Sequence, residues 1–179
     1  EIWMTEYLIN WNENSNTSRN FDYSKDVFNF FRSINTCMLG DFNAWIHYAA
    51  KRYYGMLGDG QYGTSSGTVT KRGYVMAHFA RFVTGMTRVE GEISDAAFTP
   101  LEGSVYISQS GDTVVAVLIN PSSEERQLTL DLPFYTLKGR MQSTTRTQNM
   151  LYTSLVQEAE TCRPVVLVPS ESVNTILFV

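Results

Sequence analysis

The order of the expected elements is the feature of this sequence that most limits its fold. Within the first 84 residues, two strand-forming segments alternate with two helix-forming segments. Such alternation is typical of a parallel sheet with helices packed on its faces. Two strands can neither close a barrel nor cover a doubly wound sheet. We therefore expect partner strands from outside this chain. The preferred interpretation is that the chain is the carboxyl part of a longer protein, and the alternative is a processed mature terminus.

The two strand segments are recognised by their density of β-branched and aromatic residues. Residues 2–9 form the first of them, and residues 42–50 form a second that we expect to be buried on both faces. A polar loop over residues 10–20 follows the first strand. A loop over residues 55–70 that contains five glycines follows the second strand.

Helix signals separate the two strands and follow the second one. Apolar side chains recur at intervals of three and four over residues 27–38, which predicts one buried stripe. Asp22 or Ser24 can cap the start of this helix, and Gly40 ends it. A second helix is expected over residues 71–83.

After residue 84 the sequence carries strand signals alone. Ser110, Gly111 and Asp112 predict a hairpin turn. Short strands are expected over residues 88–94, 103–109, 113–120, 127–132, 137–143, 164–168 and 172–179. Seven strands at such spacing are typical of a β-sandwich, and the last two are apolar enough to be central. The chain therefore divides into residues 1–84 and residues 85–179.

Composition excludes several classes of partner. The 14 basic and 18 acidic residues give a formal charge of −4 with no strongly basic stretch, which argues against nucleic acid. No apolar run approaches the roughly 18 residues of a membrane span. No spacing of ligands suggests a metal site, and no nucleotide-binding motif is present, so no cofactor is expected. Cys37 and Cys162 could pair, but two buried free thiols are the preferred interpretation.

Reactive groups of parallel α/β proteins lie at the carboxyl ends of strands. The first strand carries Glu6 and Tyr7 there. The second carries His47, Tyr48, Arg52 and Tyr54. Glu6 can be a solvated or ion-paired residue at a strand end, or a nucleophile in an aromatic-lined cleft. Sugars stack on aromatic rings, so the second interpretation points to a glycosidase.

Four sequence blocks, in order and with near-matching gaps, closely resemble the end of glycoside hydrolase family 30. The blocks are residues 3–6 (WMTE), 41–45 (DFNAW), 51–55 (KRYYG) and 71–79 (KRGYVMAHF). The similarity covers roughly residues 1–90 and is nearest to the bacterial xylanase branch, the glucuronoxylanases.

The resemblance implies a (β/α)8 barrel joined to a side β-sandwich. Residues 1–84 would be barrel strand 7 to helix 8, and residues 85–179 the sandwich. Family members are retaining enzymes that act on a polysaccharide, here xylan, without a cofactor. The nucleophile maps onto Glu6, whereas the acid/base Glu would lie in the amino-terminal remainder of the same protein. The resemblance also implies a secreted, cell-surface or periplasmic location.

In the glucuronoxylanase branch an Arg and a Tyr bind the glucuronic acid branch of xylan, and they map onto Arg52 and Tyr54. Tyr48 stands where Trp is usual. Two expected phenols are replaced by Leu8 and Ala49, which weakens the acid-sugar pocket.

Three aromatic or histidine side chains complete the expected substrate-binding set. His47, at a position where Trp is common, either lines the cleft as a hydrogen-bond donor or is a satisfied buried histidine. Tyr7 lies beside the nucleophile. Trp11 is a candidate sugar platform, whereas Trp3 and Trp45 are expected to pack in the barrel.

Three functions remain open at this point. The first is an endo-xylanase acting on glucuronoxylan, which Arg52 and Tyr54 favour. The second is another activity of the same family: a β-glucosidase, a β-1,6-glucanase or a chain-end xylanase. The third is a non-enzymatic carbohydrate-binding module, which the strand-end Glu6 argues against.

Overall fold

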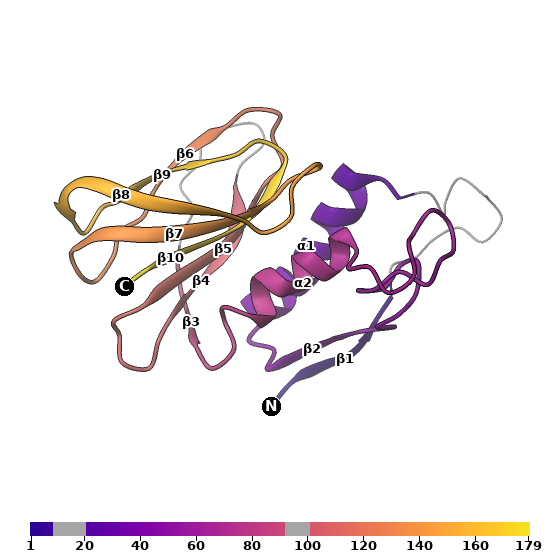
Figure 1. Ribbon diagram of the computed structural model, residues 1–179. Helices are drawn as coiled ribbons and strands as arrows, with labels where there is room; N and C mark the ends of the chain where they lie inside the picture. Colours follow the sequence, from indigo (N-terminus) through magenta and orange to yellow (C-terminus); the bar gives the residue numbers. More distant parts are fainter. Residues whose placement is uncertain (9–20, 92–100) are drawn as a thin grey trace. The chain divides into compact units, whose positions relative to one another are not determined.

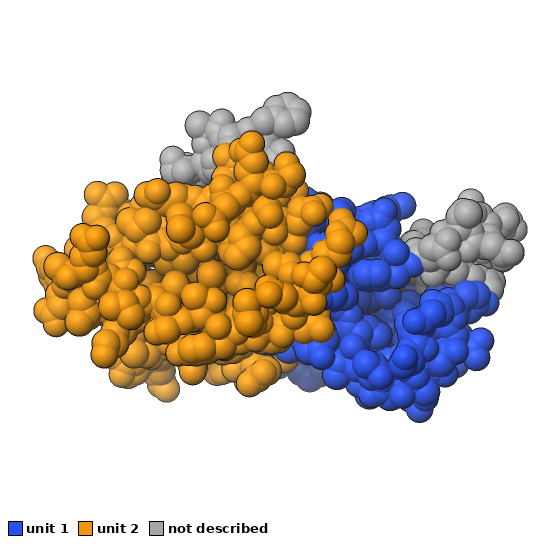
Figure 2. Space-filling model, turned by 45° about the horizontal axis from the view of Figure 1, so that its top comes forward, with its two compact units in different colours: residues 1–77 blue, residues 78–179 orange. Residues whose placement is uncertain are grey.

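The computed structural model describes residues 1–8, 21–91 and 101–179. These residues form two compact units, 1–77 and 78–179 (Figures 1 and 2). The sequence pattern divides the chain after residue 84, whereas the two compact units meet in sequence inside helix α2, Lys71–Ala80.

A short parallel sheet is the basis of the first unit. Strand β1, Trp3–Tyr7, pairs in parallel with β2, Ala44–His47 (Figure 1). The predicted parallel arrangement is therefore confirmed, although both strands are shorter than their apolar segments. The expectation that the second strand is buried on both faces is wrong for this chain. Ile46 is 46% exposed because a two-stranded sheet leaves one of its faces uncovered.

Helix α1, Phe28–Leu39, connects the two strands and follows a π-helical turn, Tyr23–Val27. The Asp22 carboxylate accepts a hydrogen bond from the backbone N–H of Lys25 at 3.1 Å, which is the predicted cap. The helix ends before Gly40, as expected. Its buried stripe consists of Phe28, Phe30, Phe31, Ile34 and Cys37.

Helix α2 is shorter than predicted. It ends at Ala80, and the backbone N–H groups of Phe82 and Val83 both bond to the Phe79 carbonyl in a closing turn. The apolar pattern of the sequence continues through this turn, which is why it predicts a helix that reaches residue 83. Neither helix of the described ranges is long and apolar enough to cross a membrane.

The second unit is built from two antiparallel sheets. The larger has six strands in the order β3–β4–β5–β10–β7–β8, and β6 pairs with β9 in the smaller (Figure 1). The strands are β3 Thr87–Val89, β4 Glu102–Ile107, β5 Val114–Asn120, β6 Arg126–Thr129, β7 Thr136–Thr144, β8 Leu151–Thr161, β9 Val165–Val168 and β10 Ser172–Phe178.

The core of the second unit lies between the two sheets. Leu118, Met141 and Phe178 of the larger sheet form one cluster with Val166 and Val168 of β9. Strand β10 is central, as predicted, between β5 and β7. The same prediction is wrong for β9, because its alternate side chains face outward in a sheet of only two strands.

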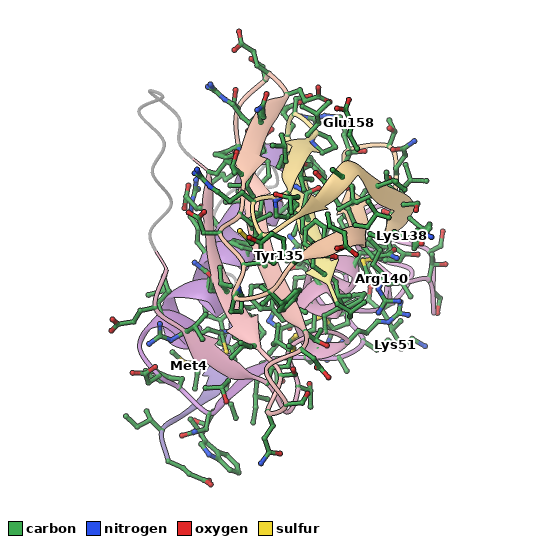
Figure 3. All side chains as sticks on the ribbon, turned by 90° about the vertical axis from the view of Figure 1, so that its left-hand side faces the viewer. Met4, Lys51, Tyr135, Lys138, Arg140 and Glu158 are labelled. Atoms are coloured by element: carbon green, nitrogen blue, oxygen red, sulfur yellow. The ribbon has the colours of Figure 1, made fainter. Side chains whose placement is uncertain are left out.

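Strand β8 is the one strand of the described residues that the sequence did not predict. Only Leu155 of its 11 residues is buried, and Val156 is 64% exposed. The strand is the last of its sheet and most of its side chains are exposed. Its sequence therefore lacks the alternation of buried and exposed residues by which a strand is predicted. Figure 3 shows Lys138 and Arg140 of the neighbouring strand β7 close together, as two residues on one strand face should be.

Two local predictions can be compared directly with the structure. The hairpin turn at residues 110–112 is confirmed: Gly111 has a φ of +78°, and the Ser108 N–H bonds to the Thr113 carbonyl at 2.9 Å. Cys37 and Cys162 are both free thiols, as preferred. Cys37 is buried, whereas Cys162 is only half-buried.

His78 is fully buried against strands β7 and β10 and is held by two threonine hydroxyls. Its Nδ1 lies 2.8 Å from Thr175 Oγ1, and its Nε2 lies 2.9 Å from Thr144 Oγ1. The Thr175 hydroxyl donates to the His78 carbonyl, and Thr144 Oγ1 accepts from the Met150 N–H. Nδ1 must therefore donate and Nε2 accept, which fixes one neutral tautomer.

The buried imidazole should make the second unit sensitive to acid. Burial lowers the pKa of His78 from 6.5 to about 3, whereas the unfolded chain binds this proton near pH 6.5. The free energy of unfolding should therefore fall by about 1.4 kcal/mol per pH unit as pH drops below 6.5. Urea unfolding of the full-length protein at pH 6 and pH 4 measures this slope.

The variant His78→Gln should have a shallower slope, because it has no imidazole to protonate. His47→Gln is the matched control: His47 is only half-buried, so its removal should change the slope less. Equal slopes in the wild type and in His78→Gln would contradict the prediction.

Candidate active site

Glu6 lies where the pairing of β1 with β2 becomes irregular. Met4 is opposite Trp45 and Tyr7 is opposite His47, so β1 uses one more residue than β2 between these pairs. An extra residue of this kind is a β-bulge, which changes the direction of nearby side chains. Glu6 is exposed at the carboxyl end of the strand, so its carboxylate is accessible to a substrate.

The carboxyl ends of the two strands are joined directly. The N–H of Tyr48, just after β2, donates to the Tyr7 carbonyl at 2.9 Å. The Tyr48 side chain is 48% exposed, and the peptide bond that follows it, to Ala49, is cis. Arg52 is also exposed. Glu6 thus lies near the carboxyl end of β1, and Arg52 lies in the chain that follows the neighbouring parallel strand β2.

Tyr7 and His47 pack with helix α1. The rings of Trp45 and His47 are stacked with 5.8 Å between centroids, and Tyr7 lies 5.3 Å from Trp45. Phe30 of α1 makes edge contacts with Trp45 at 5.3 Å and with His47 at 5.1 Å. Tyr7 and His47 are predicted from the sequence to bind substrate. In the structure, the rings of both residues contact Phe30.

His47 donates a hydrogen bond to the backbone. Its Nε2 lies 3.1 Å from the Tyr54 carbonyl, an atom that can only accept. Burial lowers the pKa of His47, and the positive charge of Arg72 lowers it further, against the hydrogen bond to Tyr54. The imidazole is therefore neutral near pH 7 and acts as a fixed donor to the chain that follows β2.

Tyr54 is the most buried of the predicted substrate-binding residues that the structure describes. It is 9% exposed, and its ring meets Tyr53 edge-on at 4.9 Å. Tyr53 in turn contacts Tyr62 at 4.5 Å. The turn over residues 52–55 is thus packed by its own aromatic rings, while Arg52 stays exposed on it.

Arg72 is a buried residue of this unit to which the sequence gave no role. Its Nη2 is 3.5 Å from Asp26 Oδ2, and its Nη1 donates to the Tyr53 carbonyl at 3.3 Å. The guanidinium carbon lies 5.1 Å from the centre of the Phe21 ring. Only the pairing with Asp26, which is distant in sequence, could have identified this site.

Removal of the Asp26 charge should destabilise the first unit. Asp26→Asn leaves the Arg72 guanidinium buried without a counter-ion. We expect the free energy of unfolding of the full-length protein to fall by about 3 kcal/mol, the low end for such pairs. The 3.5 Å separation is the reason for choosing the low end. Urea unfolding measures the loss.

The double variant Asp26→Asn/Arg72→Met should recover part of that loss, because it removes both charges. A loss below about 0.5 kcal/mol in Asp26→Asn, which is typical of a surface substitution, would contradict a stabilising buried pair.

Two further predictions from the sequence concern the Trp11 side chain and a metal site. Trp11, the candidate sugar platform, lies outside the described residues. Within the described ranges, no group of three or more His, Cys, Asp or Glu side chains could hold a metal ion.

Sequence comparisons relate the chain to two curated enzymes. It is 35% identical over 126 residues to "Glucuronoxylanase XynC" of Bacillus subtilis (strain 168), and 34% identical over 127 residues to the same-named enzyme of Bacillus subtilis. Each match includes 69% of this chain and 26% of the relative, so the chain matches about a quarter of those enzymes. No model of a known protein family matches the sequence.

Solved structures share the fold. A family 30 endoxylanase from Clostridium papyrosolvens C71 has a TM-score of 0.76 at 21% identity over 99% of this chain and 41% of that one. A family 30 subfamily 8 xylanase from Clostridium acetobutylicum has a TM-score of 0.76 at 23% identity, over 99% and 42%. A GH51 α-L-arabinofuranosidase from Thermotoga petrophila RKU-1 has a TM-score of 0.67 at 11% identity, over 100% and 43%.

The chain thus has a fold found in glycoside hydrolases. At sequence identities of 11–23%, the structural similarity shows the fold alone. The curated relatives are more specific. Together the two comparisons confirm the resemblance to glycoside hydrolase family 30 and to its bacterial xylanase branch, of which this chain matches a part.

Proposed function

We propose that this chain is the carboxyl-terminal portion of a retaining glycoside hydrolase that cleaves β-1,4-xylan, as an endo-xylanase acting on glucuronoxylan. One observation carries the proposal: Glu6 is exposed in the carboxyl-terminal half of β1, and Arg52 is exposed in the turn that follows the neighbouring parallel strand β2. The similarity to the Bacillus glucuronoxylanases supports the substrate class.

The proposed architecture is the one that the resemblance to glycoside hydrolase family 30 implies. Residues 1–84 are strand 7 to helix 8 of a (β/α)8 barrel, and residues 85–179 are a side β-sandwich. The parallel pair β1–β2 with α1 between the strands supports the first part. The two antiparallel sheets that share one core support the second. The remaining six barrel strands come from the amino-terminal part of the same protein.

The proposed mechanism uses two carboxyl groups in two steps. In the first step a Glu6 oxygen bonds to the anomeric carbon as the glycosidic C–O bond breaks, and an upstream Glu gives its proton to the leaving oxygen. In the second step that Glu takes a proton from water, whose oxygen replaces Glu6 at the anomeric carbon. Retention of configuration requires the two carboxyl groups to lie about 5–5.5 Å apart.

Glu6→Gln should abolish turnover without loss of fold. The amide is nearly isosteric with the carboxylate but cannot form the covalent intermediate. We expect the rate with xylan to fall by about a thousandfold or more, which corresponds to about 4 kcal/mol of barrier. The rate of reducing-end release by the full-length protein measures the effect, and its thermal midpoint serves as the control for folding.

Azide should restore activity to Glu6→Ala and give a product of inverted configuration, because a small anion can occupy the space of the missing carboxylate. Near-normal turnover by Glu6→Gln would refute the role of Glu6 as the nucleophile.

Arg52, with Tyr54 beside it in the turn, is the proposed binding site for the glucuronic acid branch. A guanidinium can bind a carboxylate through two parallel hydrogen bonds. The exposure of Arg52 at the strand end supports this role. Tyr48, exposed on the same strand end, is a further contact for the sugar. Tyr7 and His47 are proposed to support the substrate-binding residues indirectly, through ring packing and through the hydrogen bond from His47 to the Tyr54 carbonyl.

Arg52→Ala should slow cleavage of glucuronic-acid-decorated xylan more than cleavage of undecorated xylooligosaccharides. The charged pair exists only when the substrate carries the acid. We expect a loss of about tenfold in kcat/KM on the decorated substrate, which is the low end for a charged hydrogen bond. The low end is expected because Leu8 and Ala49 replace two phenols that would help to hold the acid branch. Steady-state kinetics on both substrates at matched salt test this, and equal losses would make Arg52 a structural residue.

A second candidate function keeps the same catalytic step with a different substrate. Leu8 and Ala49 favour an enzyme of this scaffold that ignores the acidic branch, such as a β-glucosidase, a β-1,6-glucanase or a chain-end xylanase. A binding module without catalysis is disfavoured because it has no use for an exposed carboxylate at a parallel strand end.

We also propose a secreted or cell-surface location. A structure similar to this chain, at a TM-score of 0.70, is described as a conserved exported protein of Bacteroides fragilis.

A further inference from the structure

Three consecutive carbonyl groups in the turn after β2 are each held by a side chain from elsewhere in the first unit. The Tyr53 carbonyl accepts from Arg72 Nη1 at 3.3 Å. The Tyr54 carbonyl accepts from His47 Nε2 at 3.1 Å. The Gly55 carbonyl accepts from Thr70 Oγ1 at 2.6 Å. We call these three hydrogen bonds the carbonyl clamp.

The donors of the carbonyl clamp are themselves fixed. Arg72 is 6% exposed and ion-paired with Asp26. The imidazole of His47 is stacked on Trp45. Thr70 caps helix α2, because its Oγ1 also accepts the N–H of Gly73 at 3.2 Å. Two donors therefore come from the start of α2 and one from the end of β2.

The turn also fits closely between these two elements. A Cβ atom on Gly55 would clash with the Ala49 carbonyl oxygen. A Cβ atom on Gly73 would lie 2.6 Å from the Met56 carbonyl oxygen, closer than real Cβ contacts. The backbone at Gly55 thus lies against Ala49 and Ala50, which follow β2, and the backbone at Met56 lies against Gly73 of α2.

We propose that His47, Thr70 and Arg72 are positioning residues that set the preference for carboxylate-bearing xylan, because they fix the backbone from which Arg52 reaches the substrate. This inference rests on the proposed function. An exposed arginine has a long side chain with many rotamers, so its ability to meet one carboxylate depends on a backbone that does not move. The carbonyl clamp supplies that fixed backbone without touching the substrate.

Thr70 offers the sharpest test, since single substitutions separate its two roles. Thr70→Val removes the hydroxyl at nearly constant shape, and Thr70→Ser retains it. Thr70→Asp keeps the cap of α2 but has only acceptors when ionised, so it cannot donate to the Gly55 carbonyl. Thr68→Val is the matched control, because Thr68 is an exposed threonine of the same loop.

The first measurement follows amide hydrogen exchange in the full-length protein. The N–H groups of Arg52, Gly55 and Leu57 bond within this turn. Their exchange should be about 2- to 12-fold faster in Thr70→Val and Thr70→Asp, the factor that one net hydrogen bond of about 0.5–1.5 kcal/mol provides. Thr70→Ser and Thr68→Val should match the wild type, as should the amides of β5 and β10. Unchanged exchange in Thr70→Val would overturn the clamp.

The second measurement compares kcat/KM on decorated and undecorated xylooligosaccharides. Thr70→Val should lose about 2- to 12-fold on the decorated substrate, mainly through KM, and less on the undecorated one. Equal losses on both substrates would reduce Thr70 to a purely structural role and overturn the inference.

The controls separate this inference from the proposed function. If the wild type cleaves both substrates equally, the acid-sugar specificity fails, and the positioning role fails with it. If the wild type discriminates and Arg52→Ala does not, while Thr70→Val discriminates as strongly as the wild type, the proposed function stands and the positioning role is overturned.

Discussion

The parallel pairing of β1 with β2 is the constraint on which the rest of the first unit depends. Parallel strands require a crossover, and α1 supplies it while burying its Phe30 against the rings of β2. The same pairing brings both carboxyl ends to one edge, where the Tyr48 N–H bonds to the Tyr7 carbonyl. Exposed Glu6 on β1 therefore lies beside the segment that leads from β2 to exposed Arg52.

Apart from β8, the strands and the two α-helices could be predicted from local sequence, but the faces of the strands could not. Residues 44–47 place apolar or aromatic groups on both sides of the strand, so their pattern does not say which side meets α1. Pairing decides this, and it turns the ring of His47 toward Phe30. The bulge beside Glu6 likewise exists only relative to β2 and has no local signature.

Buried polar groups were the other feature that the sequence did not reveal. Arg72 and Asp26 are far apart in the chain, and each looks like an ordinary surface charge until helix α2 is placed. The two threonine partners of His78 come from β7 and β10, which only the sheet order brings together. In both cases burial is tolerated because the side chain has partners from distant parts of the chain, a relation that no local pattern reveals.

Strand β8 has a consequence for the behaviour of this chain in concentrated solution. It is the last strand of its sheet among the described residues, and a long straight edge of this kind is a template for the strands of other molecules. Two features oppose that association. Gln157 turns aside to hydrogen-bond both the N–H and the carbonyl of Val165 on β9, and Glu158 and Glu160 place negative charge on the final part of the edge. A second copy that approached this edge would meet the Gln157 side chain already bonded to β9 and the like charges of Glu158 and Glu160, and both oppose edge-to-edge pairing.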